Sequence, residues 1–262
     1  FGKQPSVRWG RQHRAVIHAD AAWLASVIFR LEGSPQLLRR LPVVVNSLCA
    51  ARGDRLILPF QEQTPGHAGS AEQTALSDVS VRYGRAVEAV LRYASEPINV
   101  SDLVGKLTVD FPHTSTVVIE GMLANLVRLG FLLTGLRAPM TVTDGLKHMV
   151  ALLRAVGAAT VPEVADLVRE LYAIDEAIAR HNRTAAGEQP VRRARLTRTM
   201  LRLDNTVEQP LMLDLRLDLD VMLPDAVARD AQAAAAVLTR LTPYPHGLPA
   251  WEEYHGAFLK RY

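Results

Sequence analysis

An unbroken alternation of apolar and mostly polar residues, from Leu211 to Leu223, constrains the fold of this chain more than any other feature. Every odd-numbered position in this stretch is Leu or Val, whereas the even-numbered positions include Asp214, Asp218 and Asp220. Successive side chains of a β-strand point to opposite faces, so a period of two predicts a strand with one apolar and one polar face. The sequence therefore predicts against a purely helical fold.

Other segments carry helical periodicity and helix-capping signals. Asp20 is placed as the N-cap of a helix over residues 21–30, in which Trp23 and Val27 are four residues apart. Residues 160–163, Thr-Val-Pro-Glu, have the pattern of a capping box and predict a helix to about residue 182. Helices and strands together predict an α+β fold of mixed helices and sheets.

The central part of the chain has the element order of a winged-helix module. A hairpin is predicted from strands at 42–48 and 55–60, joined by a turn at 52–54, and residues 61–76 are predicted to form a mobile loop. A third strand at 78–84, three helices at 85–94, 101–109 and 115–129, and a returning strand at 131–134 complete the module. We therefore divide the chain into an N-terminal segment (1–41), an embedded winged-helix module for peptide recognition (42–139) and a helical and strand part (140–262).

Composition limits the cellular setting and the chemistry. Cys49 is the single cysteine of 262 residues, which excludes an internal disulfide and a multi-cysteine metal site and favours a reducing compartment. No apolar stretch approaches the roughly 20 residues of a membrane helix, and no signal peptide is visible. We expect a cytoplasmic protein, of which this chain is a fragment. No metal site is predicted, because no two histidines have ligand spacing, and no P-loop or nucleophile motif occurs.

The predicted third helix of the module argues against DNA recognition. Helices that read DNA need Arg or Lys to reach phosphates and guanine edges, but this helix offers only Arg128 and also carries Glu120. An extended peptide that adds to the third strand is the better hypothesis. The alternative is that the same residues form the core of the module. The predicted peptide-binding residues are Val79, Ser80, Val81, Arg82, Tyr83, Val118 and Met122.

Two further groups of charged residues each allow two interpretations. Carboxylates on the polar face of the long strand, Asp214 among them, could act as acid and base or hold a metal, or could be ordinary outward-facing side chains. The basic stretch that contains Arg192, Arg193, Arg195 and Arg198 could attract phosphate backbones, or could be a solvated helix face.

Several stretches resemble the N-terminal, glutamylating part of class I lanthipeptide dehydratases, the LanB-type enzymes, and of their thiopeptide relatives. They are Asp78–Arg82 with the helix that follows, Pro97–Val104, Leu126–Thr134 with the exit at Ala138-Pro139, Leu213–Leu215, and Phe258–Tyr262. Their order and spacing hold over most of the chain.

The resemblance implies an enzyme that takes glutamate from glutamyl-tRNA, as co-substrate and without another cofactor, and esterifies it onto Ser or Thr of a precursor peptide. The enzyme or a partner then eliminates glutamate to leave dehydroamino acids. The winged-helix module would bind the leader of the precursor as an added strand, Arg192, Arg193, Arg195 and Arg198 would contact tRNA, and Asp214 would be catalytic.

The resemblance also implies a homodimer, and we expect this fragment to bind the leader without catalysing alone. Two other functions remain open: a winged-helix regulator that binds DNA, and a non-catalytic adaptor that binds a peptide.

Overall fold

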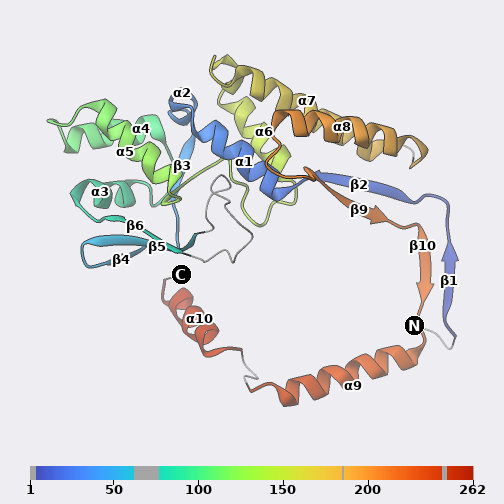
Figure 1. Cartoon of the computed structure of the whole chain (residues 1–262). Helices are drawn as coiled ribbons and strands as arrows, with labels where there is room; N and C mark the ends of the chain where they lie inside the picture. Colours follow the sequence, from blue (N-terminus) through green and yellow to red (C-terminus); the bar gives the residue numbers. More distant parts are fainter. Residues whose placement is uncertain (1–3, 62–76, 185, 244–246, 262) are drawn as a thin grey trace. The chain divides into compact units, whose positions relative to one another are not determined.

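The predicted α+β class is confirmed by a computed structural model that describes residues 4–61, 77–184, 186–243 and 247–261 (Figure 1). The chain divides into two compact units, residues 14–215 and residues 1–13 with 216–262. Residues 62–76 of the mobile loop predicted at 61–76 lie outside the described residues, and Gln61 is the last residue of a strand.

Helix α1 (Ala21–Glu32) is the centre of the larger unit and begins where the sequence predicts. The Asp20 carboxylate accepts hydrogen bonds from the backbone N–H groups of Ala22 and Trp23, at 2.9 and 3.0 Å, which satisfies two donors that a helix start leaves free. Trp23, Val27 and Leu31 recur every four residues and are fully buried. The short helix α2 (Pro35–Leu38) follows after a cap by Ser34.

The predicted hairpin partner of residues 55–60 is wrong. Strand β3 (Pro42–Val45) lies in the centre of a three-stranded sheet between β7 (Ile98–Asn99) and β8 (Leu132–Thr134). The hairpin is formed instead by β4 (Ala50–Arg52) and β5 (Arg55–Gln61), with Gly53 at φ 60° in the turn. Strand β4 ends directly before the two-residue turn at 53–54 and β5 begins directly after it, with Arg52 opposite Arg55, whereas β3 ends earlier and pairs elsewhere.

A second three-stranded sheet has the order β4-β5-β6, with β6 (Ser77–Arg82) antiparallel to β5. Three helices follow: α3 (Arg85–Tyr93), α4 (Val100–Asp110) and α5 (Thr116–Arg128). The elements of the predicted module thus occur in the predicted order, but its strands belong to two different sheets. The winged-helix assignment stays a prediction.

Three helices complete the larger unit: α6 (Gly145–Ala155), α7 (Ala165–Arg183) and α8 (Gln189–Leu203). Helix α7 packs against α6, α8 and strand β2 (Arg14–Ala19) through a buried stripe that includes Val168, Leu171, Ile174 and Ile178. The 3₁₀ turns Ala158–Thr160 and Ala186–Glu188 precede α7 and α8.

The predicted capping box is wrong. Helix α7 begins at Ala165, after Val164, and no side chain caps it. The Glu163 carboxylate instead accepts hydrogen bonds from Ser34 Oγ at 2.5 Å and Gln36 Nε2 at 3.3 Å. A contact between α2 and this turn has therefore replaced the local bond that the sequence pattern suggested.

The predicted long strand is two strands with different partners. Strand β9 (Leu211–Arg216) pairs with β2, whereas β10 (Leu219–Met222) pairs antiparallel with β1 (Ser6–Trp9) in the smaller unit. At the break, Asp218 receives a hydrogen bond from Gly10 N–H on its carbonyl and donates its own N–H to His13 Nδ1. The alternation of side chains continues through both strands, although the backbone pairing changes.

The smaller unit continues with α9 (Asp225–Leu241) and α10 (Pro249–Arg261). Its helices have apolar residues that the described chain leaves exposed, such as Leu238 and Trp251. The apolar face of β9 and β10 is also exposed, with Leu215 at 67%. The hydrophobic core of this chain therefore lies in the larger unit.

Candidate functional site

Strand β6 is an edge strand of the second sheet. Its only strand partner among the described residues is β5, in the register Leu56↔Val81 and Leu58↔Val79. Leu56 and Leu58 are buried, and Val79 and Val81 pack against the core beside them. The structure thus gathers five predicted peptide-binding residues, Val79 to Tyr83, on one open strand and its end.

The direction of the backbone groups of β6 follows from one hydrogen bond. Tyr83 N–H donates to Asp54 C=O at 2.7 Å, which makes this pair hydrogen-bonded in the antiparallel ladder. Hydrogen-bonded and non-hydrogen-bonded pairs alternate, so Val81 and Val79 also bond to β5. The backbone N–H and C=O groups of Ser80 and Arg82 consequently point toward the open edge.

A side chain from the neighbouring strand reaches over β6. Arg55 donates from Nε and Nη2 to Ser80 Oγ, at 2.9 and 2.6 Å, and from Nη2 to Ser80 C=O at 3.0 Å. A carbonyl oxygen has two acceptor sites, so this contact leaves one of them for another donor. The open edge is therefore lined by an arginine without being closed by it.

The two predicted site residues on α5 have different surroundings. Met122 is half-buried and packs against the core, whereas Val118 is 61% exposed. Leu126 and Leu129 of the predicted stripe also belong to the core or pack against it, so Val118 alone is placed wrongly, and its neighbour Ile119 is buried instead. Val118 is therefore an exposed apolar side chain in the first turns of α5.

The charged residues of α5 are engaged within the protein. Glu120 forms an ion pair with Arg39 at 2.5 Å, and Arg128 donates to Asn125 Oδ1 at 2.7 Å. Arg128, the one basic residue of α5, is therefore bonded to a side chain of its own helix.

The arginines of α8 surround two hollows on the surface. One groove, of about 320 Å³, lies between α7 and α8 and is lined by Arg180, Arg192 and Arg195; a neighbouring hollow of about 590 Å³ is lined by Arg195, Arg198 and Arg202. Arg193 is half-buried and lines neither. The structure thus brings three of the four predicted arginines together and adds Arg180 from another helix.

Most of these arginines have no acidic partner. Arg192 is paired with Glu188 at 2.9 Å, but Arg180, Arg195, Arg198 and Arg202 form no ion pair within the described part of the chain. Unpaired guanidinium groups around a hollow attract anions, and they suit phosphate oxygens in particular.

Asp214 lies on β9 and is paired with a histidine. The distance from His18 Nε2 to Asp214 Oδ2 is 3.3 Å, and the Asp214 side chain is 69% exposed. Asp218 and Asp220, which share the predicted polar face, are separated from Asp214 by the break between β9 and β10. The shared carboxylate face of these three residues stays a prediction. Across the described residues, no group of three or more His, Cys, Asp or Glu could hold a metal ion.

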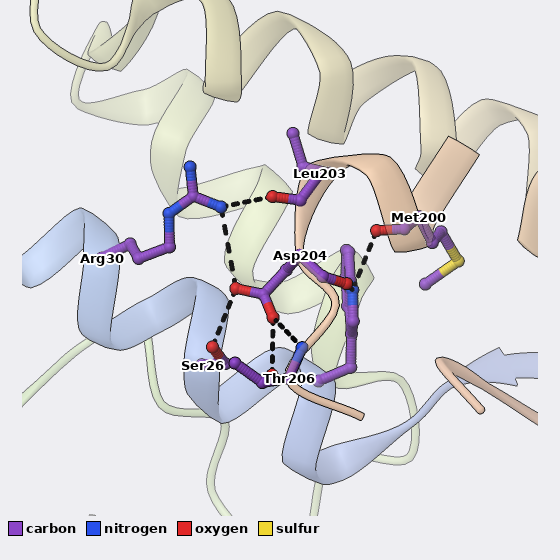
Figure 2. A network of polar contacts seen from close by, with 7 residues as sticks. Ser26, Arg30, Met200, Leu203, Asp204 and Thr206 are labelled. Carbon is purple, nitrogen blue, oxygen red and sulfur yellow. Dashed lines mark hydrogen bonds and ion pairs between the residues drawn. The ribbon is translucent and has the colours of Figure 1, made fainter. Parts of the chain in front are cut away.

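Figure 2 shows a buried polar network that joins α1 to the end of α8. The Asp204 carboxylate accepts hydrogen bonds from Ser26 Oγ at 2.8 Å and from Thr206 N and Oγ1 at 3.0 and 2.5 Å, and Arg30 Nη1 lies 3.6 Å away. Trp23 Nε1 donates to the Asp204 carbonyl at 3.2 Å. These bonds attach the C-terminal end of the arginine-bearing helix α8 to α1.

The network also sets the protonation of Asp204. Burial by itself would raise the pKa of this carboxyl group, but the hydrogen bonds from Thr206 and Ser26, together with the charge of Arg30, lower it below the usual value. The carboxylate is therefore ionised at neutral pH. The sequence did not point to Asp204, because Ser26 and Arg30 precede it by more than 170 residues and the local bond to Thr206 is an ordinary turn contact.

Two other observations bear on the chemistry. Burial raises the pKa of the Cys49 thiol to about 11, which makes it a poor nucleophile. None of the described helices has both the length and the apolar character to cross a membrane.

Residues 1–262 match the family described as "Lantibiotic dehydratase, N terminus". The chain belongs to this family. The subtilin biosynthesis protein SpaB of Bacillus subtilis is 27% identical over 245 residues, which cover 93% of this chain and 22% of SpaB. The predicted resemblance to LanB-type dehydratases is thereby confirmed.

Solved structures agree with membership of the lantibiotic dehydratase family. The tRNA-dependent lantibiotic dehydratase MibB from Microbispora sp. 107891 is 30% identical with a TM-score of 0.78, over 100% of this chain and 25% of MibB. The glutamylation domain of TbtB, from thiomuracin biosynthesis, is 19% identical with a TM-score of 0.58, over 88% of this chain and 26% of the TbtB chain, and it shares the fold. The chain thus spans about a quarter of the length of these relatives.

Proposed function

We propose that this chain is part of a tRNA-dependent dehydratase that transfers glutamate from glutamyl-tRNA to Ser or Thr hydroxyls of a precursor peptide. The support is membership of the lantibiotic dehydratase family together with the likeness to MibB and to the TbtB glutamylation domain. In the transfer, the hydroxyl oxygen bonds to the glutamyl carbonyl carbon, the bond to the tRNA ribose oxygen breaks, and the hydroxyl proton passes to a base or to the leaving oxygen. Elimination of glutamate then gives the dehydroamino acid.

The role that we propose for β6 is to bind the leader of the precursor as an added strand. The observation that carries this proposal is the alternation of hydrogen-bonded pairs between β5 and β6. It directs the backbone groups of Ser80 and Arg82 toward an edge that has no strand partner among the described residues. Strand addition supplies main-chain hydrogen bonds, each contributing about 0.5–1.5 kcal/mol net. The winged-helix interpretation of residues 42–139 is part of this proposal.

The arginine-lined hollows beside α8 are proposed to contact the tRNA. Phosphate binding by guanidinium groups releases counterions, so affinity falls steeply with salt. Arg195 lines both hollows and has no acidic partner within the described residues, and we therefore expect it to contribute more than Arg192 or the half-buried Arg193.

Asp214 remains the proposed catalytic residue. Its carboxylate is exposed and paired with His18, so a substrate hydroxyl could approach it and a proton could be accepted there. The rest of the site would come from parts of the enzyme outside this chain, which fits the expectation that the chain alone binds the leader without catalysis.

Proline substitution at Ser80 tests the strand-addition role. Proline removes the outward N–H of β6, and edge strands tolerate it on the side away from their neighbour. Val81→Pro would be uninformative, because that N–H bonds to β5. We expect the Kd of a fluorescently labelled leader peptide, measured by anisotropy, to rise about tenfold for Ser80→Pro.

Ser80→Ala is the matched control, because it removes the hydroxyl but keeps the N–H, and we expect a change of less than threefold. Circular dichroism would show that both variants fold. Equal affinities of the two variants for the leader would refute strand addition at β6.

The tRNA role is tested by filter binding of glutamyl-tRNA at several salt concentrations. Each phosphate contact contributes roughly 0.7–0.9 to the slope of log affinity against log salt. Replacing both Arg195 and Arg198 by Ala should therefore reduce the magnitude of this slope by about 1.5. Arg169→Ala is the control, since Arg169 is exposed on α7 but paired with Asp166. A slope that is unchanged in the double variant would rule out this surface.

A further inference from the structure

The groove of about 320 Å³ lies between α7 and α8, which pack side by side in the larger unit (Figure 1). Its two walls are single helix faces, because the lining residues of each helix recur three or four positions apart. The lining consists of Ala173, Ile174, Ala177 and Arg180 on α7, and of Arg192, Arg195, Leu196 and Thr199 on α8. The groove is therefore formed by the packing of two helices.

The floor of the groove, the buried part of its lining, is apolar. Ile174 and Leu196 are 1% and 6% exposed, and the small side chains of Ala173 and Ala177 lie on the same face of α7. None of these four side chains has a hydrogen-bonding group. A phosphate placed on this floor would lose water without gaining a partner, which is unfavourable. The floor therefore favours a ligand that has an apolar face.

The rim of the groove, its exposed arginines, is basic. Of Arg180, Arg192 and Arg195, only Arg192 has an acidic partner within the described part of the chain. The guanidinium groups of Arg180 and Arg195 also donate no hydrogen bond to a described residue. A guanidinium group binds anions through its N–H groups and stacks on aromatic rings through its flat face. The rim therefore suits a ligand that joins an anion to a flat ring.

We propose that this groove holds the base of one unpaired nucleotide of an RNA, while the rim binds the phosphates beside it. The proposal rests on the tRNA role of α8 and specifies how the RNA is held. Only a base outside a double helix exposes its face to a protein. Stacking of that face on side chains needs no base-specific hydrogen bond, so the groove tolerates any base.

The size of the groove agrees with a single base. Its volume of about 320 Å³ is at the lower end of the roughly 300–1,000 Å³ of small-ligand sites. One ring system fits in such a space, whereas a double helix does not.

The neighbouring hollow supports an RNA over an acidic peptide. Arg195 lines both spaces, and the second is bordered by Arg198 and Arg202, so basic groups continue beyond the apolar floor. A nucleic acid carries a charge on every backbone unit next to every base, which matches an apolar floor flanked by arginines on both sides. A peptide has no backbone charge and would need acidic side chains at each of these places.

Two short single-stranded RNAs of equal length and charge test the proposal on the whole chain: an oligouridine and its abasic counterpart. Both carry a fluorescein label, and fluorescence anisotropy measures their Kd. We expect the oligouridine to bind about five- to tenfold more tightly, because stacking of one base contributes at least this factor.

Ala173→Leu fills the groove without changing its charge, and Leu is nearly as favourable in a helix as Ala. We expect this variant to lose the preference for the oligouridine. Its affinity for the abasic RNA and the slope of log affinity against log salt should not change. Ala194→Leu is the matched control, since Ala194 is exposed on α8 and lines neither hollow, and it should keep the preference.

Equal affinities of wild type for the two RNAs would refute the base-binding groove. The tRNA role would still stand if the Arg195 and Arg198 double variant lowers the salt slope. A preference for the oligouridine that persists in Ala173→Leu would place the base elsewhere and also overturn the proposal. Failure to bind either RNA or glutamyl-tRNA would refute the tRNA role as well.

An acidic, leucine-containing peptide is the competing ligand in the same assay. If it binds more tightly than both RNAs and loses affinity in Ala173→Leu, the groove belongs to a protein ligand and the proposal is wrong. Should Ala173→Leu fail to fold, as judged by circular dichroism, Arg180→Lys decides, because Lys keeps the charge but lacks the flat face. We expect Arg180→Lys to reduce the preference for the oligouridine by about twofold or more, and an unchanged preference would overturn the proposal.

Discussion

Replacing Asp204 by Asn should destabilise the larger unit by a measurable and pH-dependent amount. The carboxylate accepts three hydrogen bonds, two from Thr206 and one from Ser26, and its side chain is 4% exposed. Asn keeps the shape but turns an NH₂ group toward one of these donors. One partly buried donor then loses its acceptor, which costs about 1–3 kcal/mol.

Arg30 adds little to this cost, because its side chain is 46% exposed and water can replace the carboxylate. We therefore expect Asp204→Asn to lower the free energy of unfolding by about 2 kcal/mol at pH 7. Urea titration followed by tryptophan fluorescence measures this change, since Trp23 is fully buried beside the network. Asp214→Asn, at an exposed carboxylate, should change the free energy by less than about 1 kcal/mol.

The pH dependence provides a second check. The pKa of Asp204 is lowered in the folded protein relative to the ordinary value of 3.8, so its ionisation stabilises the fold above that value. This contribution is lost as the pH falls through the folded pKa. The difference between wild type and Asp204→Asn should be constant near neutrality and shrink below about pH 4. Equal midpoints for the Asp204 and Asp214 variants, or a difference that does not shrink in acid, would refute the reasoning.

Two further predictions concern Cys49 and two glycines, Gly121 within α5 and Gly130 just after its end. Burial raises the pKa of Cys49 from 9.0 to about 11. Iodoacetamide at pH 8 should therefore alkylate the folded protein about 100-fold more slowly than the urea-unfolded protein. Equal alkylation rates, measured by mass spectrometry, would contradict this. Gly130→Ala should lower the free energy of unfolding by about 1–2 kcal/mol, because Gly130 has φ 81°. Gly121→Ala should instead stabilise α5 by up to about 1 kcal/mol, because the added Cβ would meet open space. Urea unfolding of both variants distinguishes them, and a Gly130 variant as stable as wild type would contradict the expectation.

Local signals predicted the elements well where each side chain acts within its own segment. Asp20 caps α1 because its carboxylate needs only the next backbone N–H groups, and Trp23, Val27 and Leu31 form a stripe that any partner would bury. The family resemblance was also available from the sequence, since it depends on the order of such segments. A peptide-binding third strand was predicted from the same local pattern, and β6 does form with an open edge among the described residues.

Partnerships between distant residues were decided by the tertiary structure. Glu163 had the spacing of a capping residue, but α2 offers it Ser34 and Gln36. The alternation from Leu211 to Leu223 could not show that its two halves pair with different strands, because the side-chain period is the same in both. Val118 was placed on the wrong face by one position, since the packing of α5 determines which stripe is buried.

The sequence by itself determined the fold class, the start of α1 and the order of strands and helices through the central part of the chain, because backbone preference and side-chain periodicity act over a few residues. Only the tertiary structure decided which backbone groups of β6 point to its open edge, the grouping of Arg180 with the arginines of α8, and the network around Asp204. Each of these depends on strand register or helix packing, which fix the distance between residues that the sequence leaves far apart.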